Sequence, residues 1–282
     1  SVDPVPILKD HPDVIVLLGG LWAAYLLAVR RRTQGDPFAA ADATPRRRTL
    51  FSLGMLSLLV ASSWPVHDLA EERLYAVHMV QHMLYQFVAP PLLIAGIPVW
   101  MWRGLLRVRG VSAALRFLVR PLVALVLFNA VVLFIHWPAV VEASVGSEPL
   151  HFALHVLIVG TALVMWWPVM SPLPELPPLA PPGQMLYLFF QSLAPTIPAS
   201  FLTFGHSPLY PIYATFPRIW GISPLEDQLI AGLVMKLGGG LILWGFIAAI
   251  WFRWYARDTR EGFDTVRLVA VERDVRARLS RP

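Results

Sequence analysis

The stretch HMVQHMLYQFVAPPLLIAGIPVW, residues 78–100, begins with two histidines and continues as an apolar run. Its length matches the roughly 20 residues that a helix needs to cross the hydrocarbon core of a membrane, which is about 30 Å thick. Backbone groups in lipid must be hydrogen-bonded within the segment, so the run is predicted to be helical. His78 and His82 are four residues apart and therefore share one face of the predicted helix.

The rest of the chain has the composition of a membrane protein. Hydrophobic residues make up 56% of its 282 residues and charged residues only 15%, against about 25% charged in an average soluble domain. Apolar runs long enough to span a membrane cover residues 14–29, 50–66, 76–101, 119–137, 151–170, 184–204 and 228–252. The sequence therefore predicts an all-α fold, a seven-transmembrane-helix bundle over residues 1–255, followed by a basic tail, residues 256–282, that forms a short cytoplasmic helix.

Arginines are concentrated in alternate loops of the predicted bundle. The loop after the first span carries RRR at 30–32 and again at 46–48, and the loop after the third carries five arginines between 103 and 120. The C-terminal segment carries eight more, from Arg253 to Arg281. Because basic loops stay in the cytoplasm, this pattern places the N-terminus outside and the C-terminus inside. The loop-by-loop distribution accounts for the net charge of +5, so no nucleic-acid partner is needed to explain it. The basic tail is expected to contact anionic lipid of the bilayer.

All eight histidines fall on the predicted outer side of the membrane. Two HxxxH pairs open the third and the fifth span from that side. Imidazole is the commonest metal-ligating side chain and suits copper, zinc, iron and nickel. Two facing pairs would form a four-nitrogen metal site, to which histidines at the same depth after the second span and at the end of the fourth could add. The predicted ligands are His78, His82, His151 and His155, with His67 and His136 as a further pair.

The remaining histidines and the sulfur-containing residues are left outside this site. His11 and His206 are interpreted as incidental polar residues near the membrane surface. The chain has no cysteine, so a soft metal could be bound only by histidine and methionine. Met79 and Met83 flank the first pair, but they lie about 100° round the helix from their histidine neighbours. They are therefore expected to face lipid or another helix.

Prolines and one buried charge mark two further places in the bundle. Pro90 and Pro91 in the third span, and the prolines of the sixth, are expected to bend their helices and to free carbonyls that need partners. Lys236 is the only charged side chain well inside any predicted span, and a run of three glycines follows it. Asp227 stands nine residues before it, about 13 Å along a regular helix, so a direct ion pair is not expected. Asp227 and Lys236 are kept as further candidate site residues.

Several stretches together resemble one membrane-protein family, the CtaG-type assembly factors of caa-type cytochrome c oxidase. They are the block at 78–98, HWP at 136–138, the second histidine pair followed by WWPVMSPLP, LYPIYA at 209–214, and EDQLIAGLVMKLGGGL at 226–241. The resemblance covers about residues 14–255. It implies a bacterial plasma-membrane protein that takes part in the maturation of a cytochrome c oxidase, with the oxidase subunits as its partners.

The resemblance and the histidines lead to one main hypothesis and two alternatives. The main hypothesis is a non-enzymatic assembly factor that handles copper through the histidine cluster, because the copper centres of such an oxidase face or approach the outer side. One alternative is an electron-transfer protein with bis-histidine haem, ligated for example by His82 and His155. The other is a metal or ion transporter in which the bent helices and Lys236 line a path. The sequence offers no plausible hydrolase constellation.

Overall fold

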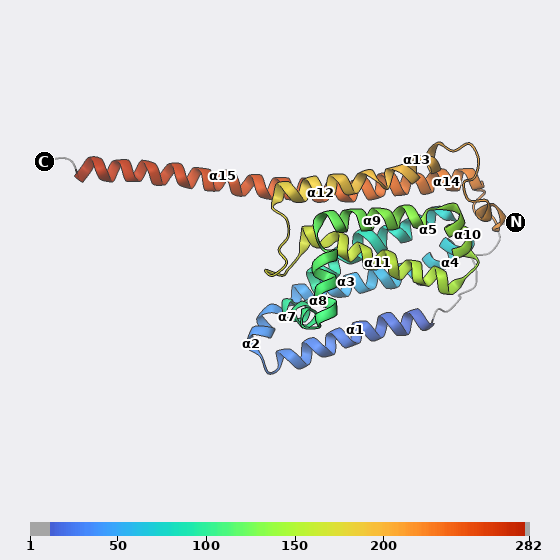
Figure 1. Cartoon of the computed structure of the whole chain (residues 1–282), viewed down its shortest axis with the longest axis horizontal. Helices are drawn as coiled ribbons and strands as arrows, with labels where there is room; N and C mark the ends of the chain where they lie inside the picture. The colour runs from blue at the N-terminus through green and yellow to red at the C-terminus, as the bar shows by residue number, and fades with distance from the viewer. Residues whose placement is uncertain (1–11, 280–282) are drawn as a thin grey trace.

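Figure 1 shows the computed structural model of the chain, which describes residues 12–279. Helices and turns make up this described range, and it contains no strand, which confirms the predicted all-α fold. Five helical segments are long and apolar enough to cross a membrane, and two bent helix pairs bring the number of spans to as many as seven. His11 lies outside the described residues.

The single spans and the bent pairs have the following bounds. The five single spans are α1 (Pro12–Thr33), α3 with α4 (Pro45–Ala61 and Val66–Glu72), α11 (Glu148–Met170), and α12 with α13 (Pro181–Leu193 and Thr196–Phe204). The fifth, Pro224–Arg260, consists of α14 (Pro224–Leu233), a π-helical turn (Val234–Gly238) and the first part of α15 (Gly239–Leu279). The bent pairs are α5 (Tyr75–Met83), a π-helical turn (Leu84–Val88) and α6 (Ala89–Gly96) with α7 (Val99–Leu106), and α8 (Arg109–Leu118) with α9 (Pro121–Ile135). Shorter helices, α2 (Pro37–Asp42), α10 (Pro138–Val145) and a 3₁₀ turn (Pro211–Thr215), lie in the connections.

Two predicted spans are shorter than the sequence suggested. The third ends at Gly96 and not at residue 101, because Ile97 is extended before Pro98 and α7 turns away by 95°. The fourth begins at Pro121, where extended Arg120 separates it from α8 at an angle of 84°. In both places a proline disfavours helical geometry in the residue before it. The apolar residues next to these spans, such as Trp100, therefore belong to short helices, α7 and α8, that lie at a steep angle to the spans.

The prolines of the third span are accommodated by a change of helix type. Pro90 has no N–H to donate to the carbonyl of Gln86, and the helix has already widened into the π-helical turn Leu84–Val88. The indole Nε1 of Trp166, on α11, donates to that carbonyl oxygen at 2.8 Å. The predicted free carbonyl is thus present, and a buried side chain from another span satisfies it.

The last span contains a second π-helical turn, which packs against α5 close to the first turn. Lys236 lies in this second turn, Val234–Gly238. Gly239 follows it, where an added Cβ would lie 3.3 Å from the Phe87 ring and 3.6 Å from the Met83 sulfur. The glycine therefore allows the third and seventh spans to approach closely at Met83 and Phe87, which follow His82 along the third span.

The third span is also fixed against the first two. An added Cβ on Gly96 would lie 2.3 Å from the backbone nitrogen of Phe51, so only glycine permits this crossing of α3 and α6. Tyr25 donates through its hydroxyl to the Gly96 carbonyl at 3.0 Å. Arg47 donates to the carbonyls of Ala95 and Ile97 at 3.3 and 3.1 Å. The C-terminal carbonyls of α6 therefore have partners, as a buried helix end requires.

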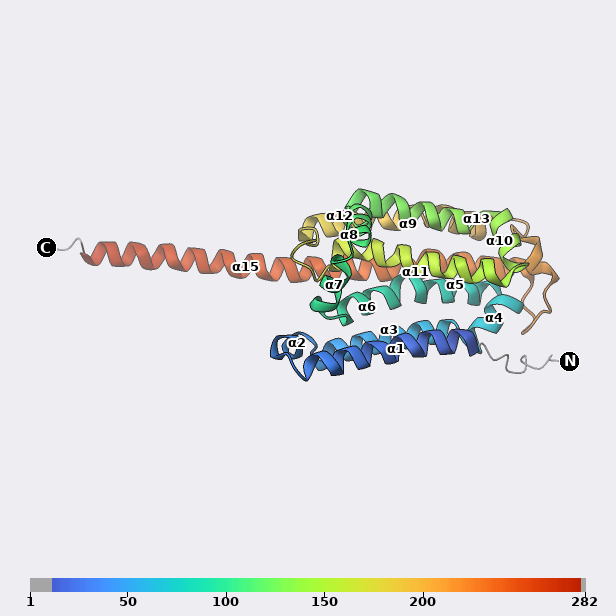
Figure 2. The same cartoon turned by 60° about the horizontal axis from the view of Figure 1, so that its bottom comes forward.

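The tail is helical as predicted, but it is not a separate short helix. Helix α15 runs from Gly239 to Leu279 without a break and extends far beyond the bundle in Figures 1 and 2. The sequence has no proline between Pro224 and Pro282 that would stop it. Within the tail, Arg276 donates to Glu272 at 2.7 Å, a pair with the i,i+4 spacing that supports an exposed helix.

The two ends of the bundle differ in character. Helices α4 and α10 lie at one end, and α2, α7 and α8 lie toward the other (Figure 1). The arginine clusters belong to the second end, since they lie at the end of α1, the start of α3 and along α7 and α8. The predicted grouping of basic loops at one end is thus present. Which end faces the cytoplasm stays a prediction from the charge distribution.

Candidate metal centre

Six histidines from four segments of the chain meet at the end of the bundle that carries α4 and α10. They are His67 on α4, His78 and His82 on α5, His136 at the end of α9, and His151 and His155 on α11. The ring centroids within each HxxxH pair are 4.3 and 4.2 Å apart, and those between the pairs come within 5.8 Å. The structure therefore brings together all six predicted ligands, although 88 residues of sequence separate the first from the last.

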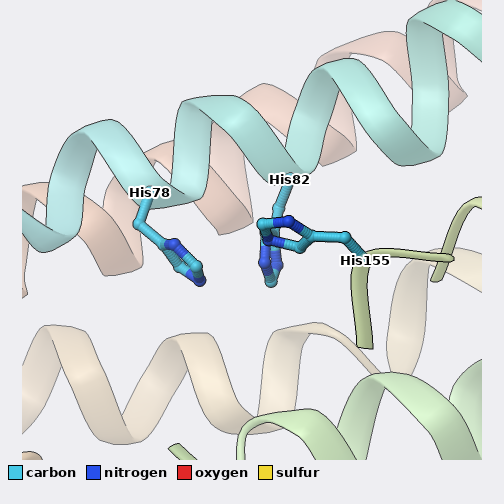
Figure 3. Close-up of side chains that lie close together, drawn as sticks. All are labelled: His78, His82 and His155. Carbon is cyan, nitrogen blue, oxygen red and sulfur yellow. The ribbon is translucent and has the colours of Figure 1, made fainter. Parts of the chain in front are cut away.

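Three of these histidines form an inner group. One ring nitrogen each from His78, His82 and His155 lie within 4.8 Å of one another. Figure 3 shows the rings of His78 and His82 extending from the same side of α5 and the ring of His155 reaching toward His82 from another segment. In the described structure, the Nδ1 atoms of His78 and His82 are buried and lack a hydrogen-bond partner. Buried polar atoms without partners are costly, which fits nitrogens that serve to bind an ion.

A second, outer group contains a carboxylate. Single ligand atoms of Glu71, His151 and His155 also lie within 4.8 Å of one another. Glu71 Oε1 is 2.7 Å from His151 Nε2 and 3.1 Å from His67 Nδ1. His151 Nε2 is 3.1 Å from His155 Nε2. The four-nitrogen site predicted from the two HxxxH pairs is therefore divided between two groups that share His155.

Glu71 was not predicted from the sequence, and neither was Gln81. Glu71 stands four residues after His67, the same spacing as the two histidine pairs, so a search for mixed His/Glu ligand spacing would have found it. Gln81 is fully buried, and its Nε2 lies 2.8 Å from the Ala61 carbonyl, 3.1 Å from His67 Nδ1 and 3.3 Å from the Tyr85 hydroxyl. Gln81 therefore fixes the position of His67 relative to α5.

His136 is oriented by its own helix and by a loop. Its Nδ1 donates to the Val132 carbonyl at 2.7 Å, and the Tyr210 hydroxyl donates to its backbone carbonyl. Its Nε2 is buried without a partner in the described structure, and its ring centroid is 5.9 Å from that of His82. A donated Nδ1 proton leaves Nε2 with the free lone pair that a metal ligand needs. His136 is thus placed to add to the inner group.

Asp227 acts on this site through the helix that carries the first histidine pair. Its carboxylate is almost fully buried and accepts hydrogen bonds from the backbone N–H groups of Tyr75 at 2.9 Å and Ala76 at 2.8 Å. Those groups are among the unpaired donors at the start of α5. Arg218 Nη1 lies 3.6 Å from the same carboxylate. Asp227 caps α5 from the last span and thereby sets the position of His78 and His82.

Two cavities of different size meet at the cluster. The smaller, about 20 Å³, is lined by the inner histidines together with His151 and His136, Met79 and tyrosine and apolar side chains. The larger, about 480 Å³, lies between α1, α3 and α11 and is lined mainly by apolar side chains, with His67 and Glu71 at its polar end. His151 and His155 line both cavities. The space between the inner rings is of the size of one water molecule or ion.

Lys236 and His206 lie away from the cluster. The Nζ of Lys236 is 5.5 Å from the centroid of the Phe204 ring, a cation–π distance. Lys236 also lines a separate cavity of about 20 Å³ with Gln86 and Thr196. His206 is exposed in the loop after α13, and the metal-ligand groups found among the described residues do not include it. Its interpretation as an incidental residue stays a prediction.

The fold and the histidine cluster define a class: a multi-pass helical membrane protein with a buried imidazole site at one end of its bundle. Residues 23–257 match the family model for the cytochrome c oxidase caa3 assembly factor, Caa3_CtaG, and the chain belongs to this family. The match confirms the resemblance seen in the sequence and with it a role in assembly of the caa3 oxidase. Searches of curated proteins and of solved structures gave no match.

Proposed function

We propose that this assembly factor binds copper at its histidine cluster and passes it to the oxidase as cargo. The observation that carries the proposal is the convergence of His78, His82 and His155 with ligand atoms within 4.8 Å of one another. Ligand atoms at such separations need only small side-chain rotations to reach an ion at about 2.0–2.1 Å each. The partnerless nitrogens of His78 and His82 support the same assignment.

The donor set favours a borderline metal over a hard one. The inner position offers imidazole nitrogen alone, which suits copper, zinc, iron and nickel and does not suit magnesium or calcium. Among these metals, copper is the one that links the site to the family's role, because cytochrome c oxidase must receive copper during assembly. Binding and release need ligand exchange only, so the proposal requires no catalytic reaction.

The dimensions of the inner position favour an ion over haem. Its cavity of about 20 Å³ has room for an ion or a water molecule between the rings. A porphyrin would have to separate His82 from His155, whose ring centroids are 5.9 Å apart. The bis-histidine haem alternative therefore demands a rearrangement that copper binding does not.

Metal analysis of the purified protein tests the proposal. After incubation with copper at neutral pH and removal of excess, the wild-type chain is expected to retain copper. The variant His78→Ala/His82→Ala is expected to bind copper at least about 100-fold more weakly, since even the loss of residues that only orient metal ligands costs 10–100-fold. His206→Ala, which removes an exposed histidine, serves as the control. Equal copper retention in all three proteins would refute the proposal, and a Soret band in the wild-type spectrum would favour haem.

A further inference from the structure

We infer that the cluster holds copper at two successive positions, an outer one at Glu71, His151 and His155 and an inner one at His78, His82 and His155. The ion moves from the outer to the inner position by exchanging ligands around His155, which belongs to both. This inference rests on the proposed function and adds to it a second metal site and a direction of transfer.

The distances at the outer position are those of a ligand set before metal binding. Glu71 Oε1 is 2.7 Å from His151 Nε2, and His151 Nε2 is 3.1 Å from His155 Nε2. Atoms that bind one ion at about 2.0–2.2 Å lie about 3 Å apart from one another. The outer group therefore needs little movement to surround an ion, and it includes a carboxylate, which the inner group lacks.

The two cavities give the positions different access. Glu71 lines only the large cavity of about 480 Å³, whereas His78 and His82 line only the small one of about 20 Å³. His151 and His155 line both and form the boundary between them. An ion that enters through the large cavity therefore meets Glu71 and His151 first. His151 and His155, which line both cavities, lie next to it on the way to His78 and His82.

The exchange needs no change of oxidation state. The ion keeps His155 as a ligand while Glu71 and His151 leave and the two α5 histidines bind. The ring centroids of His155 and His78 are 6.0 Å apart, and those of His155 and His82 are 5.9 Å apart, so the receiving ligands are already adjacent. Glu71 then regains its contact with His151. Because imidazole binds copper better than carboxylate does, the inner position is the tighter one.

Copper uptake followed in time tests this order. The wild-type protein and variants are mixed with copper(I) buffered by a weak coloured chelator, and the loss of chelator colour gives the loading rate. A strong chelator added afterwards measures the retained copper. Glu71→Gln is expected to load about tenfold more slowly, by analogy with the cost of losing a group near a metal, and to retain as much copper as the wild type. Glu148→Gln removes the same charge from the same large cavity but not from the ligand group, and it is expected to load at the wild-type rate.

Two further variants separate the positions. His82→Ala is expected to take up copper at a near-normal rate and to lose it to the strong chelator, because only the outer position is intact. His155→Ala is expected to lose both properties. The inference is overturned if Glu71→Gln loads as fast as Glu148→Gln, or if Glu71→Gln and His82→Ala lose retention equally, as they would at a single site. Failure of the wild type to bind copper at all would instead overturn the proposed function.

Discussion

In cells whose only copy of this protein carries His155→Ala, caa3 oxidase activity is expected to fall to about a tenth of the wild-type level or lower. His155 is the one residue shared by both ligand groups, and its ring centroid is 4.2 Å from that of His151 and 6.0 Å from that of His78. Its loss leaves two ligands at each position, too few for the three or four that hold a tightly bound ion. Oxygen consumption with reduced cytochrome c, measured on isolated membranes, reports the effect.

The control for this experiment is His206→Ala, with the amounts of both variant proteins in the membrane compared by immunoblot. Added copper in the growth medium is expected to restore part of the activity in the His155→Ala strain, because a higher copper concentration partly replaces delivery of copper to the oxidase by the assembly factor. Full oxidase activity in that strain without added copper would show that maturation does not depend on the cluster.

Asp227→Ala is expected to cause the largest loss of stability of any single substitution near the site. The buried carboxylate satisfies two N–H groups at the start of α5 and lies beside Arg218. Alanine would leave these donors and a half-buried guanidinium without their partner, which costs about 2–4 kcal/mol. The expected result is a lower unfolding temperature in detergent, together with weaker copper retention because α5 carries His78 and His82.

Asp227→Asn is the matched comparison. Asparagine keeps one oxygen that can accept from the helix start but loses the charge that faces Arg218, so a smaller loss of about 1 kcal/mol is expected. Unfolding temperatures that are the same for alanine, asparagine and the wild type would contradict the capping role assigned to Asp227.

The histidine cluster was largely predictable, because most of its histidines occur in pairs with a helical spacing that is visible in the sequence. The i,i+4 spacing at His78/His82 and at His151/His155 places each pair on one helix face, and the position of each pair near a span end sets its depth. The number of apolar runs likewise predicted a bundle of up to seven spans. These features depend on residues close together in sequence. The thickness of the hydrocarbon core sets the helix length that a span needs, so apolar runs of that length can be recognised directly.

Other features depend on contacts between distant segments and were not predictable in this way. The sequence marks Asp227 as a candidate site residue but does not show that it caps a helix that begins 152 residues earlier. Glu71 joins the cluster because α4 follows α3 and lies at the end of the bundle where α11 begins. The bends before Pro98 and Pro121 had a local signal in the proline itself, but that signal does not give their angles of 95° and 84°.

Alternating arginine-rich and arginine-poor loops predicted which loops share an end, and the structure places them so. The histidines lie at the opposite end from the arginine-bearing helices α7 and α8. An ion bound at the cluster would therefore lie at the end of the bundle opposite these basic helices. This position agrees with the predicted outer location, which the charge rule assigns and which topology reporters fused to the two termini can check.

X-ray absorption at the copper edge, on wild-type protein loaded with one equivalent of copper, tests most directly whether these histidines form a metal site. The account predicts nearest neighbours that are nitrogen or oxygen at about 2 Å, with the outer-shell scattering of three imidazole rings. It predicts weaker imidazole scattering in His78→Ala/His82→Ala, which keeps only the position at Glu71, His151 and His155. Copper that shows no imidazole scattering, or a spectrum identical in the double variant, would contradict it.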